Sequence, residues 1–145
     1  MAIGLLASCS ENNSEHDVIA QEEVVTNAEV KNFSKSQNNL QCKENTIDCV
    51  IDNAIRCSIN YKQSFCNKDL LPQFIFMEDP TLKRPTNVSY QIVKTKQITE
   101  NITEVYTKMS CDGNWFGLCN GNIIYVLENL NSSWKLQDIY ALQQF

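Results

Sequence analysis

The fold of this chain is decided by the sequence Trp134-Lys-Leu-Gln-Asp-Ile-Tyr140 and by the apolar-rich stretches that precede it. There are four apolar-rich stretches, and the last of them contains this sequence. They are Val88 to Thr99, Ile102 to Cys111, Asn122 to Asn129 and Trp134 to Leu142. Apolar and polar residues alternate in much of this segment, which is typical of strands that bury one face. Turn-forming residues separate each stretch from the next, as antiparallel neighbours require. The segment therefore predicts four consecutive antiparallel strands.

A helix is predicted before these strands, from Asn45 to about Gln63. Thr46 can cap its first turn, and the charge of Asp48 is favourable near a helix N-terminus. Apolar residues recur at spacings of three and four, as in a helix with one buried face, at Ile47, Val50, Ile51, Ala54, Ile55 and Ile59. We also expect a short helical turn over Asn67 to Pro72. The expected fold class is α+β, with an N-terminal helix packed on a curved four-stranded antiparallel sheet and stapled by disulfides.

The 145 residues leave room for one domain and a tail. The segment Glu11 to Gln41 is rich in Asn, Ser, Glu and Gln. Such a composition buries too little apolar surface to offset the entropy cost of ordering. We therefore expect a flexible tether over 10–43 and a folded domain over 44–145.

The seven cysteines favour disulfides in an oxidising compartment, because no CxxC pair occurs and the single histidine, His16, lies in the polar tail. No metal and no cofactor are expected. The pairing most strongly favoured joins Cys111 to Cys119, since a hairpin would bring them opposite each other. Two further pairs are possible beside the predicted helix, although spacing alone does not fix them. They are Cys42 with Cys49, and Cys57 with Cys66.

The run Leu6-Ala7-Ser8-Cys9 resembles the lipobox of bacterial lipoproteins, in which the cysteine receives diacylglycerol and becomes the mature N-terminus. Residues 1–9 then represent a signal remnant, although only eight residues precede Cys9 and none is basic. Lipidation of Cys9 leaves an even number of cysteines for pairing. The resemblance implies an acyl anchor, such as palmitate, in the cell envelope, facing the periplasm or the surface, and Ser10 favours the outer membrane. The alternative is that Cys9 is an ordinary thiol.

The order of elements and the stretch Asn131-Ser-Ser-Trp-Lys-Leu-Gln-Asp-Ile-Tyr140 resemble the nuclear transport factor 2-like (cystatin-like α+β) family, over about Asn45 to Phe145. Enzymes of that family place Asp, His or Tyr in a pocket between helix and sheet. The resemblance implies a cavity here lined by Leu71, Phe74, Tyr90, Tyr125, Trp134 and Asp138. No histidine falls in the domain and Asp138 has no matched partner, so we expect a protein that is not an enzyme.

The net charge of −5 and the scattered basic residues exclude ordinary nucleic-acid binding. Trp115 and Phe116 lie at the tip of the loop that Cys111 and Cys119 would close. They either fold back onto the core or form a contact surface for a partner or a membrane. The expected function is that of a non-catalytic, lipid-anchored envelope protein that binds another protein. Type IV secretion core components share the fold, which suggests a secretion role by analogy. The alternative is a small-ligand-binding domain or degenerate enzyme that uses the helix–sheet cavity.

Overall fold

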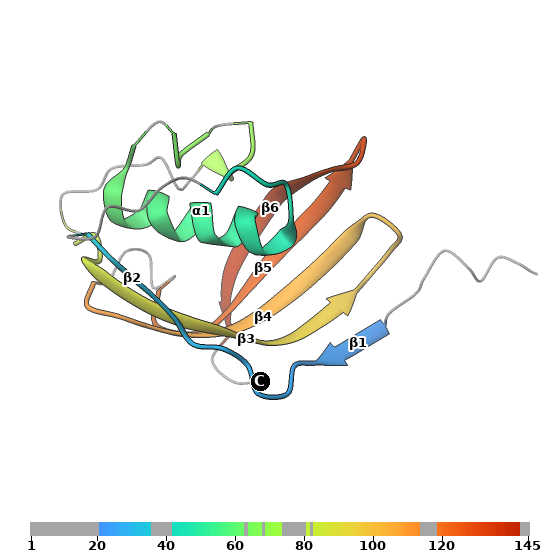
Figure 1. Cartoon of the computed structure of the whole chain (residues 1–145), viewed down its shortest axis with the longest axis horizontal. Helices are drawn as coiled ribbons and strands as arrows, with labels where there is room; N and C mark the ends of the chain where they lie inside the picture. Colours follow the sequence, from blue (N-terminus) through green and yellow to red (C-terminus); the bar gives the residue numbers. More distant parts are fainter. Residues whose placement is uncertain are drawn as a thin grey trace, which may run out of the picture.

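The computed structural model describes residues 21–35, 42–62, 64–67, 69–73, 81, 83–113 and 119–142. Its elements are β1 (Gln21–Val24), β2 (Lys31–Ser34), α1 (Ile47–Asn60), β3 (Asn87–Gln97), β4 (Ile102–Cys111), β5 (Gly121–Leu130) and β6 (Ser133–Leu142). The strands form one six-stranded antiparallel sheet in the order β1-β3-β4-β5-β6, and β2 also pairs with β3. Helix α1 lies across one face of this sheet (Figure 1). We call that face the inner face and the opposite one the outer face. The fold class is α+β.

The four long strands predicted from the sequence are confirmed, but β1 and β2 were missed. Both pair with β3, with Glu23 opposite Thr95 and Phe33 opposite Val88. They come from residues 21–34, which the sequence analysis assigned to the tether, so the prediction of four strands is corrected to six. Each added strand has only four residues, and those of β1 are all exposed. Backbone pairing with β3 therefore holds β1, and its side chains carry no pattern that predicts a buried face.

Helix α1 begins and ends close to where the sequence predicts. The Thr46 hydroxyl accepts a hydrogen bond from the Cys49 N–H at 3.2 Å, which caps the first turn. Tyr61 adopts a left-handed conformation with φ 49°, and its N–H donates to the Cys57 carbonyl at 2.9 Å. A helical turn follows as predicted, because the Leu71 N–H donates to the Asn67 carbonyl at 3.0 Å.

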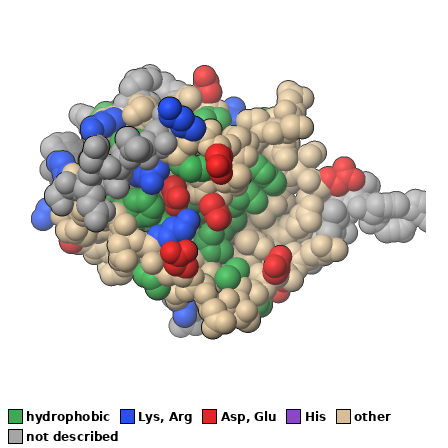
Figure 2. Space-filling model, in the orientation of Figure 1, with side chains coloured by type: hydrophobic (Ala, Val, Ile, Leu, Met, Phe, Trp, Pro, Cys, Tyr) green, Lys and Arg blue, Asp and Glu red, His purple; other side chains and the backbone are tan. Residues whose placement is uncertain are grey.

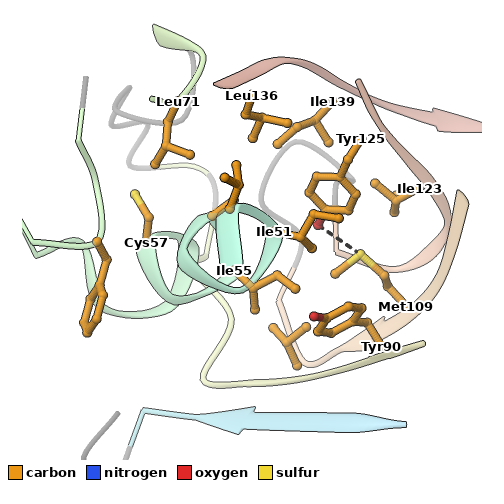
Figure 3. Close-up of a cluster of buried hydrophobic side chains, with 14 of the residues drawn as sticks. Ile51, Ile55, Cys57, Leu71, Tyr90, Met109, Ile123, Tyr125, Leu136 and Ile139 are labelled. Atoms are coloured by element: carbon orange, nitrogen blue, oxygen red, sulfur yellow. Dashed lines mark hydrogen bonds between the residues drawn. The ribbon is translucent and has the colours of Figure 1, made fainter. Parts of the chain in front are cut away.

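The core lies between α1 and the inner face of the sheet. Ile51 and Ile55 point from the helix into a cluster of buried side chains from the strands (Figure 3). The sheet contributes Val88, Tyr90, Val105, Met109, Ile123, Tyr125, Leu127, Leu136 and Ile139. Burial of this apolar surface is the main favourable contribution to folding, and it fixes α1 on the sheet.

Three disulfides join the described residues, and they are the three pairs considered from the sequence. Cys42, which precedes α1, forms a disulfide with Cys49 in the first turn of the helix, and their Cα atoms are 5.4 Å apart. Cys57–Cys66 (5.0 Å) ties the last turn of α1 to the segment that follows it. Cys111–Cys119 (5.6 Å) closes the connection between β4 and β5. The disulfides indicate an oxidising, extracytoplasmic location. Of the helices in the described part of the chain, none is long and apolar enough to span a bilayer.

Asp112 clamps the end of β4 to the start of β3. Its carboxylate accepts hydrogen bonds from the Thr86 hydroxyl, from the Thr86 N–H at 2.7 Å and from the Asn87 N–H at 3.0 Å. These hydrogen bonds, chiefly the one from the Thr86 hydroxyl, hold the pKa of Asp112 well below its usual range. The carboxylate therefore stabilises the folded state only while it is ionised.

We expect Asp112→Asn to lower the urea midpoint of unfolding near pH 7 and to weaken the loss of stability in acid. The folded-state pKa of Asp112 lies below the unfolded-state value of about 3.9. Its contribution is thus fully present above that value and is lost as the pH falls toward the folded-state pKa. Urea titrations between about pH 7 and pH 2 measure both effects.

Asp138→Asn is the matched control, because Asp138 is exposed and accepts a hydrogen bond from the adjacent Ile139 N–H at 2.8 Å. If Asp112→Asn keeps the acid dependence of the unmodified chain, or loses no more stability than Asp138→Asn, the clamp is refuted.

Candidate functional site

Of the residues predicted to line a helix–sheet cavity, most of those that the structure describes belong to the core. Leu71, Tyr90 and Tyr125 belong to the buried cluster, and Trp134 packs against it. The Tyr125 hydroxyl donates to the Met109 Sδ at 3.3 Å, and burial raises the pKa of Tyr125 (Figure 3). These side chains fill the space between α1 and the sheet.

Asp138 lies apart from the buried tyrosines because of a β-bulge. Leu136 is buried, and strict alternation would place Asp138 on the same inner face. The pairing of β5 with β6 shifts between Val126 and Leu127, so one extra residue separates Leu136 from Asp138 in register. Ile139 takes the inner position instead, and Asp138 is exposed.

Four predicted site residues lie outside the described residues: Cys9, Phe74, Trp115 and Phe116. The lipidation of Cys9 and the contact surface at Trp115 and Phe116 remain predictions. The six remaining cysteines of the prediction form the disulfides described above.

The structure instead assembles a polar cluster at the edge of the core, from three elements that lie far apart in the sequence. Tyr90 on β3 is 2% exposed, and its hydroxyl donates to the Asp52 carboxylate on α1. The other Asp52 oxygen lies 3.6 Å from the Lys31 ammonium on β2. Burial, and then the charge of Asp52, raise the pKa of Tyr90, so its hydroxyl stays protonated and acts as a donor. The cluster links β2, α1 and β3.

Aromatic and cationic side chains extend this cluster along β2. The Phe33 ring stacks on Tyr90 with centroids 5.9 Å apart, and the Arg56 guanidinium lies 5.2 Å from the Phe33 centroid. The Lys31 ammonium is 5.8 Å from the Tyr90 centroid. These contacts connect the side chains of β2, α1 and β3 along this edge of the domain.

A pocket of about 280 Å³ opens beside the cluster. Its lining combines apolar groups with carboxylates and consists of Glu23, Val25, Ala28, Glu29, Lys31, Asp48, Tyr90, Ile92 and Thr95. An adjoining pocket of about 620 Å³ shares Glu23 and Thr95 and continues past Ile47 to Gln97 and Thr103. We call the two together the α1–β1 groove. Figure 2 shows acidic and hydrophobic side chains next to each other on the face where α1 lies beside the sheet.

Three exposed apolar side chains lie in the segment that forms β1 and leads into β2. Val24 is 68% exposed, Val25 37% and Val30 54%. Val25 lines the groove, whereas Val24 pairs with Lys94 and therefore lies on the outer face. A run of exposed apolar residues beside a pocket is characteristic of a binding surface, whereas single exposed apolar residues are common everywhere.

The groove carries an excess of negative charge. Among the described residues, ion pairs join Lys31 to Asp52 and Lys94 to Glu22 (3.4 Å). None of the ion pairs in this part of the chain involves Glu23, Glu29 or Asp48. The carboxylates of these three residues therefore remain unneutralised within the described structure.

A second polar cluster lies on the outer face. The Tyr106 and Tyr140 hydroxyls donate to the two oxygens of Glu104 at 2.8 and 3.3 Å, and the Lys94 ammonium lies 4.3 Å from the Tyr106 ring centroid. Burial, and then the hydrogen bond to Glu104, raise the pKa of Tyr106 to about 12. Tyr106 and Tyr140 flank Ile124 in neighbouring strands, so the cluster covers this buried residue on the outer face.

Sequence reasoning missed the α1–β1 groove, although one local signal was present. Asp48 and Asp52 are four residues apart on a predicted helix, which places both on one side of it. Lys31, Asp52 and Tyr90 lie far apart in the sequence, so no local pattern connects them. Strand β1, which forms one side of the groove, was not predicted. Within the described part of the chain, no group of three or more His, Cys, Asp or Glu side chains is placed to hold a metal ion. No protein-family model, curated protein or solved structure matched this chain.

Proposed function

We propose that this chain is a non-catalytic, lipid-anchored protein of the bacterial cell envelope whose domain binds another protein. The observation that carries the proposal is the set of exposed apolar side chains Val24, Val25 and Val30 at one edge of the sheet. Leu71, Tyr90 and Tyr125, which were expected to line an internal cavity, pack into the core instead, which favours a surface function. The disulfides agree with an extracytoplasmic domain.

The anchor and the family are parts of the same proposal. Leu6-Ala7-Ser8-Cys9 supports attachment to the membrane through acyl chains, with the outer membrane favoured by Ser10. A nuclear transport factor 2-like domain is supported by one helix packed across an antiparallel sheet and by the sequence around Trp134. Its partner would be a protein of the cell envelope, such as a component of a secretion system.

A second candidate function is the binding of a small ligand. The observation that favours it is the pocket beside Tyr90, whose size of about 280 Å³ lies just below the usual range for small-molecule sites. Asp138 takes no part in this site, because it is exposed on β6.

Photo-crosslinking in intact cells tests the protein-binding proposal. A benzophenone amino acid is placed in turn at Val24 and Val30 on the sheet edge, and at the exposed Leu130 on the far side of the sheet. We expect a discrete adduct from at least one position, and mass spectrometry of the adduct then identifies an envelope protein. If no position gives a discrete adduct under conditions in which the protein is abundant, the protein-binding function is refuted.

A further inference from the structure

The occupant of the α1–β1 groove is restricted first by charge. Glu23, Glu29 and Asp48 line it, and the one lysine in its lining, Lys31, is already paired with Asp52. An anionic ligand, such as a phosphate or a lipid headgroup, would be repelled. A cationic group is favoured, because complementary charge gives both attraction and selectivity at an interface.

The second restriction comes from apolar surface. Val25, Ala28 and Ile92 line the pocket beside these carboxylates, and Val24 adds exposed apolar surface on the outer face of β1. A hydrated cation alone would leave this surface exposed to water. An occupant that carries both apolar and basic side chains would cover it.

The third restriction is the strand edge that borders the groove. Among the described residues, β1 pairs with β3 alone, so its other edge is open for a further strand. Glu23 is paired with Thr95 in register and therefore lies on the inner face. An extended segment added to β1 would point every second side chain toward the same face. Basic residues at alternate positions would then lie beside Glu23 on the inner face. The apolar residues between them would lie on the outer face, beside the exposed Val24.

We propose that the α1–β1 groove binds an extended segment of a protein partner in which basic and apolar residues alternate. The inference rests on the proposed protein-binding function and specifies the chemistry of the partner. Tyr90 lines the groove, and its hydrogen bond to Asp52 and its stacking on Phe33 hold it in place before binding, so little ordering of this side chain opposes binding.

Fluorescence anisotropy of the full, disulfide-bonded protein in non-ionic detergent tests this directly. The probe is a labelled peptide that alternates lysine and valine, and it is compared with peptides that alternate glutamate and valine or lysine and serine. We expect saturable binding of the lysine–valine peptide, weaker binding of the lysine–serine peptide and no binding of the glutamate–valine peptide. Raising the salt from about 50 to about 300 mM NaCl is expected to weaken binding severalfold, because the carboxylates are exposed.

The matched variants are Glu23→Lys and Glu100→Lys, which make the same charge change at two exposed positions. Glu100 lies in the turn between β3 and β4, outside the lining of the groove. Glu23→Lys is expected to raise the Kd of the lysine–valine peptide about fivefold or more, and Glu100→Lys less than about twofold.

Equal effects of the two variants, or equal binding of the glutamate–valine peptide, would overturn the inference. The inference would also be overturned if spermine displaced the peptide completely and bound as tightly as the peptide does. That result would assign the groove to small polyamines. An adduct from Leu130 with no peptide binding leaves the proposed function intact and refutes the groove as its site. Peptide binding without any adduct in cells supports the groove chemistry and contradicts the protein-binding function.

Discussion

Replacing both Cys57 and Cys66 with alanine is expected to lower the free energy of unfolding by about 3 to 5 kcal/mol. The disulfide closes a loop with a sequence separation of 9, for which restriction of the unfolded chain contributes about 2.5 to 3 kcal/mol. Cys57 is 0% exposed and belongs to the core cluster, so its truncation also removes packing. Urea denaturation followed by circular dichroism measures the loss, with mass spectrometry verifying that the other two disulfides are intact.

The control is the variant in which Cys42 and Cys49 are both replaced by alanine. Their sequence separation is 7, so restriction of the unfolded chain contributes nearly the same stabilisation. Cys42 is only half-buried and Cys49, although buried, lies outside the core cluster, so we expect this second pair to lose about 2 to 3 kcal/mol. An equal or larger loss for Cys42 and Cys49 would show that burial of Cys57 adds nothing to the stabilisation.

Replacing Cys9 with alanine is expected to abolish acylation and to move the protein from the membrane fraction to the soluble fraction. The proposal places the whole membrane attachment on acyl chains at this residue, and several chains together make such attachment stable. Incorporation of labelled palmitate, followed by fractionation of the cells, measures both effects in the native gene.

Ser8→Ala is the matched control, because it keeps a small residue before Cys9 and is expected to leave labelling unchanged. Processing that is insensitive to globomycin, or palmitate labelling that persists without Cys9, would contradict the lipid anchor. The protein-binding surface is tested independently by the crosslinking and peptide experiments.

The helix and the four long strands could be predicted because their signals are local. The apolar spacing from Ile47 to Ile59 and the cap at Thr46 are complete within one segment, and they agree with α1 as observed. The Cys111–Cys119 disulfide follows from a hairpin of adjacent strands. Strand β1 had no such signal, since its residues pair with Lys94–Gln97, 70 or more positions away.

The sequence by itself determined the α+β class, the bounds of the helix, the long strands and the disulfide chemistry, because each depends on neighbouring residues. Only the tertiary structure decided the proposed binding surface, because Lys31, Asp52 and Tyr90 meet through pairing of distant segments. The tertiary structure also decided on which face of the sheet Asp138 lies. Within Trp134-Lys-Leu-Gln-Asp-Ile-Tyr140 one bulge interrupts the alternation, so Ile139 enters the core and the carboxylate faces solvent.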